Sequence, residues 1–225
     1  MSEESATSGA GSGAEDQLEV GVGPHPLPWP DEPHLDPELL ANGDRRNVLD
    51  RYRYWRREAV VADLDTRRHE FHVAIENWQH DFNIGSVVRT ANAFLAAEVH
   101  IVGLRRWNRR GAMVTDRYQH VSHHEDVTAL AAWAAERDLP LLGIDNLPGS
   151  VPLETYPLPR ACVLVFGQEG PGLSPAAHEH CAAVLSIAQY GSTRSINAGA
   201  ASAIAMHAWI RRHDFGQAVG EEDQA

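Results

Sequence analysis

Short apolar runs typical of β-strands alternate with helical patterns from residue 70 to residue 213. Strands that alternate with helices pair in parallel, and helices then cover both faces of the sheet. We therefore predict an α/β fold with a mostly parallel sheet and helices on both faces. The expected strands are 70–76, 98–103, 139–144, 161–167 and 183–187, and the expected helices are 81–95, 125–137, 174–181 and 195–213.

Three polar segments stand out against this Ala- and Arg-rich background. They are 83–90 (NIGSVVRT), 166–174 (FGQEGPGLS) and 190–197 (YGSTRSIN), and each follows a strand-like run and leads into a helical pattern. Ligands of open parallel sheets bind outside the carboxyl ends of the strands, on loops that the scaffold positions. We therefore expect the functional site to be built from these three segments.

The segment 166–174 is rich in glycine. Its glycines permit positive φ angles and close backbone approach, and Ser174 can cap the next helix. The spacing matches neither the dinucleotide fingerprint nor the P-loop. A glycine-rich turn alone is more often structural than ligand-binding. Glu169 favours function, because a carboxylate in the tightest part of a turn after a buried strand is seldom there for solubility.

The other two segments leave alternatives open. In 83–90, Asn83 can cap a helix, and Arg89 lies roughly 1.7 turns further on, among apolar residues. Arg89 either pairs with a buried carboxylate or reaches toward a ligand. The segment 190–197 precedes a helix of small residues, a composition that suits close helix packing or the close approach of a ligand.

The formal net charge of −12 is concentrated at the two ends of the chain. Residues 1–44 carry ten acids and no basic residue, and the tail adds three more, which leaves 18 acids against 19 arginines in the body. We predict a disordered acidic and proline-rich arm over 1–35. The remaining predicted parts are a helical, Arg-rich extension over 36–66, one domain over 67–215 and an acidic tail over 216–225.

All basic residues are arginine, whose planar guanidinium suits phosphate contacts and base stacking. Two clusters are interleaved with aromatic residues, a composition typical of nucleic-acid binding, although a solvated helix face or a basic loop would look the same. The candidate RNA-binding residues are Arg45, Arg46, Arg53, Arg56, Arg57, Arg106, Arg109 and Arg110.

Several functional classes lack their sequence signals. None of the 13 histidines has the zinc-protease spacing, and there is no CxxC motif, so we predict no metal site. We expect Cys162 and Cys181 to be reduced packing residues. No apolar run is long enough to span a bilayer, and the N-terminal stretch lacks the features of a signal peptide. We therefore expect a cytoplasmic protein without membrane partners.

Taken in order, the three segments resemble the three motifs of the SPOUT superfamily, in its TrmH-like (SpoU) branch of RNA ribose methyltransferases. The resemblance covers residues 70–212, with Ile196 where the family usually has leucine. It implies a C-terminal trefoil knot, which periodicity could not reveal because knots are rare. It also implies a homodimer and a bound S-adenosyl-methionine (AdoMet). The implied cofactor-binding residues are Gly143, Ile144, Gly167, Ile187, Ile196 and Asn197.

The resemblance further implies methyl transfer to a ribose 2′-hydroxyl of tRNA or rRNA. The implied catalytic residues are Arg89, Asn83, Glu169, Ser195 and Asn197. The resemblance implies that Arg89 activates the hydroxyl. Since arginine keeps its proton at neutral pH, we expect Arg89 to stabilise developing negative charge and to anchor a phosphate, and a transiently deprotonated Arg89 that acts as a base is the alternative. The alternative is a knotted RNA-binding protein with weak or no methyltransferase activity. An oxidoreductase is a third possibility, against which the glycine order counts.

Overall fold

The computed structural model describes residues 21–79 and 83–217. These residues fall into two compact units, one that ends at Ala59 and one that begins at Val60. Residues 1–20 of the predicted arm and 218–225 of the predicted tail lie outside the described residues, as do positions 81 and 82 of an expected helix. The predicted domain boundaries stay predictions.

The N-terminal unit is a short, irregular fold with two helical turns, α1 (Pro37–Asn42) and η1 (Asp50–Tyr52). Asp36 caps α1 by accepting a hydrogen bond from the Glu38 amide, as expected for this residue type before a helix. Backbone bridges join Val22 to Asp44 and residue 35 to residue 55. Within residues 21–35, Val22, His25 and His34 therefore have backbone hydrogen bonds to the rest of this unit, and the predicted arm over 1–35 stays a prediction.

The second unit contains a seven-stranded sheet with the order β3-β2-β1-β6-β4-β7-β5, in which every described pair of strands is parallel. This confirms the predicted α/β class. β3 and β5 were not predicted, because β3 reads VSHH and β5 has two residues. The strands are β1 (Phe71–Asn77), β2 (Val99–Gly103), β3 (Val121–His124), β4 (Leu141–Ile144), β5 (Val151–Pro152), β6 (Cys162–Phe166) and β7 (Ala183–Ser186).

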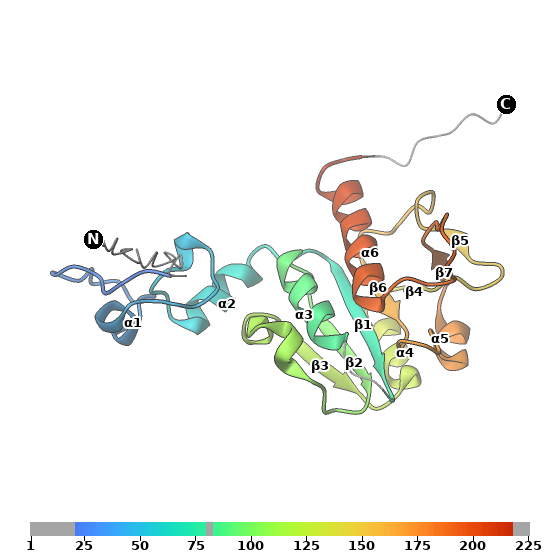
Figure 1. Cartoon of the computed structure of the whole chain (residues 1–225), viewed down its shortest axis with the longest axis horizontal. Helices are drawn as coiled ribbons and strands as arrows, with labels where there is room; N and C mark the ends of the chain where they lie inside the picture. Colours follow the sequence, from blue (N-terminus) through green and yellow to red (C-terminus); the bar gives the residue numbers. More distant parts are fainter. Residues whose placement is uncertain (1–20, 80–82, 218–225) are drawn as a thin grey trace, which may run out of the picture. The chain divides into compact units, whose positions relative to one another are not determined.

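Helices cover both faces of this sheet, as Figure 1 shows. On one face α3 and α6 pack against a core that includes Phe71 and Trp209. On the other face α4 and α5 pack against a core that includes Val163 and Leu130. The helical elements are α2 (Arg57–Asp65), α3 (Ile84–Ala93), η2 (Arg109–Ala112), η3 (Thr115–Arg117), α4 (Val127–Ala135), α5 (Pro175–His180) and α6 (Ala198–His213).

Helix α6 is held in place by the fully buried Trp209. The indole ring lies 4.6 Å from the Phe71 ring, and its N–H donates to the carbonyl oxygens of Pro159 and Arg160. Truncation of a buried tryptophan costs about 3–5 kcal/mol. Trp209 therefore fixes the position of α6, which the third polar segment directly precedes. Within the described residues, no helix is long and apolar enough to cross a membrane.

Candidate active site

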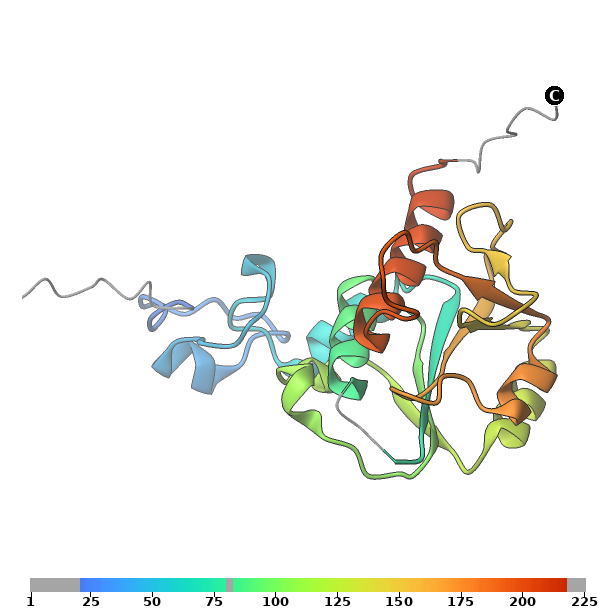
Figure 2. The same cartoon turned by 45° about the vertical axis from the view of Figure 1, so that its right-hand side comes forward.

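A pocket of about 500 Å³ opens at the carboxyl ends of β4 and β6. Its walls are the segments 144–147, 166–172, 187–189 and 195–201. Figure 2 shows the backbone of the loop that follows β6 (orange) and of the segment that precedes α6 (red), and residues of both segments line the pocket. Five of the six predicted cofactor-binding residues line the pocket, namely Ile144, Gly167, Ile187, Ile196 and Asn197.

The sixth of these residues, Gly143, lies behind the wall. It is buried in β4, and a Cβ atom there would meet the Leu173 side chain at 2.6 Å. Gly143 therefore allows the loop after β6 to pack closely on β4 and does not itself line the pocket.

The loop after β6 is a tight hairpin-like turn. Gln168 and Gly172 exchange two backbone hydrogen bonds of 3.1 and 3.0 Å. Gly170 and Gly172 have φ angles of 95° and 73°, which favour glycine. At Gly167 a Cβ atom would lie 2.0 Å from the backbone of Gly172, so only glycine fits. Ser174 then caps α5 by accepting from the Ala177 amide, as predicted.

Two carboxylates that the sequence analysis missed hold this loop. Glu76, 1% exposed, accepts hydrogen bonds from the Trp78 indole at 3.0 Å and from the Ser174 amide at 2.8 Å. Asp145 accepts from the Leu173 amide at 2.8 Å. Both acids lie at the ends of strands, directly after apolar residues. A carboxylate directly after a buried strand was the reason to single out Glu169, and the same criterion identifies Glu76 and Asp145.

The three polar segments meet through their side chains. The Asn83 amide donates to the Glu169 carboxylate at 2.7 Å, and the Asn197 amide donates to the Asn83 carbonyl oxygen at 3.0 Å. The Asn197 oxygen in turn accepts from the amides of Gly199 and Ala200 and so caps α6. Asn83 precedes α3, but its side chain does not cap that helix, because it bonds to Glu169 instead.

Arg89 lies on the exposed side of α3. No hydrogen bond or ion pair joins it to another residue of the described chain, so the alternative of a pair with a buried carboxylate is wrong for these residues. Ser86, one helical turn before Arg89, lies where α3 meets α6, with its Cβ 3.4 Å from the position of a Cβ at Gly199. Ser195 is exposed and lines the pocket.

Gln189 supplies a polar group that the sequence did not single out. Its side chain lines the pocket, and its amide oxygen is buried without a hydrogen-bond partner among the described residues. A buried acceptor without a partner is costly, and a ligand with an N–H group would satisfy it.

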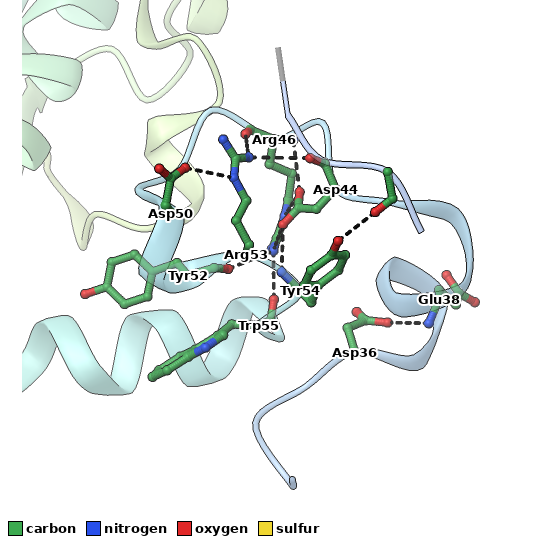
Figure 3. A network of polar contacts seen from close by, with 10 residues as sticks. Asp36, Glu38, Asp44, Arg46, Asp50, Tyr52, Arg53, Tyr54 and Trp55 are labelled. Carbon is green, nitrogen blue, oxygen red and sulfur yellow. Dashed lines mark hydrogen bonds and ion pairs between the residues drawn. The ribbon is translucent and has the colours of Figure 1, made fainter. Parts of the chain in front are cut away.

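The first group of predicted RNA-binding arginines is held by contacts inside the N-terminal unit (Figure 3). Arg46 makes a two-pronged ion pair with the fully buried Asp44 and donates to the Trp55 carbonyl oxygen. Arg53 donates to the Arg46 carbonyl oxygen at 2.6 Å. The side chains of Arg56 and Arg57 bond to the Leu35 carbonyl oxygen and to Glu58. Arg45 is exposed and has interactions of its own.

Burial alone would raise the pKa of Asp44. The hydrogen bonds from the Arg46 side chain and from the Arg46 and Tyr54 amides outweigh burial and lower that pKa below its usual value. The main contact of Arg46 is therefore the ion pair with Asp44. The arginine and aromatic residues of this segment stabilise the fold of the N-terminal unit as well as adding surface charge.

The second group, Arg106, Arg109 and Arg110, is exposed on the segment between β2 and β3. Arg109 stacks over the Trp107 ring at 5.5 Å and pairs with Asp116 at 3.3 Å. A second pocket of about 430 Å³ lies beside them, with Trp107, Arg105 and Arg109 in its lining. The segment is anchored by Asn77, whose amide donates to the carbonyl oxygens of residues 104 and 106.

A curated relative and three solved structures are similar to this chain. An uncharacterised tRNA/rRNA methyltransferase of Mycolicibacterium smegmatis is 31% identical over 144 residues, which are 60% of this chain and 44% of that protein. The chain therefore spans less than half the length of this curated relative.

Among solved structures, the TrmH/SpoU tRNA modifying enzyme of A. aeolicus has a TM-score of 0.62 at 19% identity and covers 71% of this chain and 84% of its own. The SpoU methyltransferase AviRb of Streptomyces viridochromogenes, in complex with AdoMet, has a TM-score of 0.61 at 23% identity, with 69% and 62% covered. An RNA 2′-O ribose methyltransferase has a TM-score of 0.56 at 20% identity, with 65% and 58% covered.

These structural matches show a shared fold. The sequence model of the SpoU rRNA Methylase family matches residues 70–207, a range that contains the sheet, the pocket and all three polar segments. The chain therefore belongs to the SpoU rRNA methylase family.

Proposed function

We propose that this protein is an AdoMet-dependent methyltransferase that methylates a ribose 2′-hydroxyl in tRNA or rRNA. The observation that carries the proposal is the hydrogen-bonded series Glu169–Asn83–Asn197 beside a pocket of about 500 Å³. These hydrogen bonds connect one residue from each of the three polar segments, which carry the motifs of the methylase family. AviRb is solved with AdoMet, and another neighbour is named an RNA 2′-O ribose methyltransferase.

The lining of the pocket fits AdoMet. A volume of about 500 Å³ lies within the range of small-molecule sites, and the walls combine apolar side chains with backbone polar groups. Ile144, Ile187 and Ile196 suit the flat adenine ring, and the Gln189 amide oxygen suits an N–H donor such as an amino group. When bound, AdoMet supplies a methyl group on a sulfonium.

The protein residues then have distinct roles toward the ribose. Asn83 and Glu169 orient the ribose or Arg89, while Ser195 and Asn197 position the third segment and the nucleotide. Arg89 stabilises the negative charge that develops on the 2′-oxygen and anchors the neighbouring phosphate, since a guanidinium keeps its proton at neutral pH. The exposed position of Arg89, free of described partners, supports a role toward a ligand.

RNA phosphates are bound by Arg106, Arg109 and Arg110. Arg45 and the exposed parts of the Arg46, Arg53, Arg56 and Arg57 side chains add to this binding. Each phosphate contact adds close to one unit to the slope of log affinity against log salt. The exposure of these three arginines and the Arg109–Trp107 stack support this. A C-terminal trefoil knot, a homodimer and a cytoplasmic location belong to the same proposal, which family membership supports.

Two experiments test the proposal. Ribose methylation sites are mapped in total RNA from cells with and without the gene, and at least one 2′-O-methyl site is expected to disappear. In vitro, Arg89→Lys keeps the charge but loses the planar fork, so methyl transfer is expected to fall strongly. A rate near wild type would refute the role of Arg89.

The alternative is a knotted RNA-binding protein with weak or no methyltransferase activity, which the intact motif residues disfavour. Calorimetry with AdoMet distinguishes the two, because the alternative requires no cofactor binding.

A further inference from the structure

Three histidines form a row across neighbouring strands of the sheet, from His72 near the amino end of β1 through His100 to His124, the last residue of β3. His72 Nδ1 lies 3.0 Å from His100 Nε2, and His100 Nδ1 lies 3.0 Å from His124 Nε2. They come from β1, β2 and β3, and Trp133 of α4 covers them, with its ring 4.2 Å from that of His100. His72 and His100 stand second in their strands, so they lie at the amino ends of the sheet.

Glu98 completes a group of possible metal ligands. Glu98 and His100 are two residues apart along one extended segment and so point to the same face of the sheet. Val73 of β1 pairs with Val99 of β2 in the parallel register. The residues before these, His72 and Glu98, therefore also lie opposite one another. One ligand atom from each of His72, Glu98 and His100 lies within 4.8 Å of the others.

We propose that His72 Nδ1, His100 Nε2 and the Glu98 carboxylate bind a divalent transition-metal ion, with Zn²⁺ the best match. Two imidazoles and one carboxylate are a ligand set that Zn²⁺ uses in proteins, with a water molecule in the fourth position. Hard cations such as Mg²⁺ and Ca²⁺ prefer oxygen ligands, so a site with two nitrogens disfavours them.

The hydrogen bonds around His100 match those usually found around a histidine that binds a metal. A histidine that binds a metal through one ring nitrogen donates its other N–H to a neighbouring acceptor, which fixes the orientation of the ring. His100 Nδ1 has two such partners, Ser122 Oγ at 2.8 Å and His124 Nε2 at 3.0 Å. His100 is fully buried, whereas His72 and Glu98 are partly exposed, which leaves an entry path for the ion.

Two features of the group bear on the proposal. The two ligand nitrogens are 3.0 Å apart, and Zn–N bonds of about 2.0–2.1 Å in a tetrahedral site separate them by about 3.3 Å, so a small side-chain movement suffices. Arg137 carries a positive charge nearby, but its guanidinium stacks on Trp133 and lies 3.3 Å from Glu136, which offsets that charge. The metal joins β1 to β2 and has no part in the proposed methyl transfer.

The test uses the full chain without an affinity tag, freed of metal by a chelator. Zn²⁺ binding is measured by calorimetry, and Co²⁺ is used as a spectroscopic substitute whose visible absorption reports its ligands. We expect one ion per chain and a higher unfolding temperature with Zn²⁺. Glu98→Gln, a partly exposed and nearly isosteric change, should weaken Zn²⁺ binding by about 10-fold or more and alter the Co²⁺ spectrum, as should His72→Gln.

The control is the double variant His178→Gln, His180→Gln, which replaces the two exposed histidines of the His-Glu-His sequence in α5. It should keep both the affinity and the Co²⁺ spectrum of the proposed site. Absence of stoichiometric Zn²⁺ binding by the wild type would overturn the proposal, and so would binding that Glu98→Gln and His72→Gln leave unchanged. In either case the hydrogen bonds among the three histidines and Ser122 are the whole role of the group. AdoMet affinity should be the same in all variants, so the result is independent of the proposed function.

Discussion

The side-chain amide of Asn83 lies 2.7 Å from the Glu169 carboxylate, a contact between residues 86 positions apart in the chain. A second bond, from Asn197 to the Asn83 oxygen, spans 114 positions. Asn83 therefore uses both ends of its amide, one as a donor and one as an acceptor, to hold two other segments in place. A side chain that only accepts, such as aspartate, cannot make both bonds.

Replacement of Asn83 by aspartate should reduce methyl transfer by about 100-fold, on the order of 3 kcal/mol. The change removes the donor to Glu169 and sets a second carboxylate beside it, so the two charges repel. Turnover of RNA with labelled AdoMet measures the loss. Asn47→Asp, at an exposed position, makes the same chemical change and should leave the rate unaltered. Equal rates for wild type and Asn83→Asp would show that the contact has no catalytic role.

Alanine at Gly172 should weaken AdoMet binding more than 10-fold, whereas alanine at Gly170 should have a small effect. Both glycines have positive φ, so alanine costs about 1–2 kcal/mol of backbone strain at either position. At Gly172 the new methyl group would also lie 2.3 Å from the Asp145 carboxylate that holds the loop, while nothing lies within 4 Å at Gly170. Calorimetry with AdoMet compares them. Equal affinities would exclude a role of the Asp145 contact in shaping the pocket.

Asp44→Asn should destabilise the N-terminal unit by about 3 kcal/mol, because it leaves the Arg46 guanidinium without its buried partner. Hydrogen exchange of residues 21–59 measures the change. Asp50→Asn is the control, since that carboxylate is 97% exposed and should contribute less than about 1 kcal/mol. Similar exchange in both variants would contradict a structural role for the Asp44–Arg46 pair.

The same carboxylate predicts how this unit responds to acid. The pKa of Asp44 is lower in the folded state than in the unfolded chain, where it is about 3.9. Its stabilising effect is therefore complete above that unfolded value and is lost as the pH falls through the folded one. Tryptophan fluorescence during acid titration should show Asp44→Asn unfolding at a higher pH than wild type. An unchanged midpoint would mean that another group controls the acid transition.

The two cysteines should resist thiol reagents in the native protein. Burial raises the pKa of the Cys162 thiol to about 12, and burial, with a smaller effect of Glu76, raises that of Cys181 to about 12. The reactive thiolate is therefore scarce at pH 8. Cys181 should react first because it is partly exposed, whereas Cys162 is fully buried. Mass spectrometry of a maleimide time course measures both rates, with urea-unfolded protein as the control. Rapid labelling of native Cys162 would contradict its burial.

The fold class was predictable because β4 and β6 are continuous apolar runs, β1 and β2 are largely apolar, and nearly all of their residues are buried. β3 was missed, because its histidines form hydrogen bonds along the sheet where an apolar residue would otherwise stand. The sequence of β3, VSHH, lacks the apolar run or the apolar and polar alternation that predicts a strand.

The residues of the three polar segments were predictable, but most of their contacts were not. Asn83 has the position of a helix cap, and only the folded chain brings Glu169 to it. The sequence could not distinguish Arg46 from the exposed Arg110. Only the fold shows that Arg46 is held by the buried Asp44 carboxylate and by the Trp55 carbonyl oxygen. The ligands proposed for Zn²⁺ lie on two strands, so no local spacing identifies them.

The walls of the 500 Å³ pocket come from four segments between residues 144 and 201, in a chain of 225 residues. During synthesis, the first strands of the sheet emerge long before the segment that precedes α6. The pocket therefore forms only after residue 201 has left the ribosome, and no shorter nascent chain can bind a ligand between all four walls. Ligand binding in this pocket therefore reports a chain that has been synthesised at least through the first residues of α6.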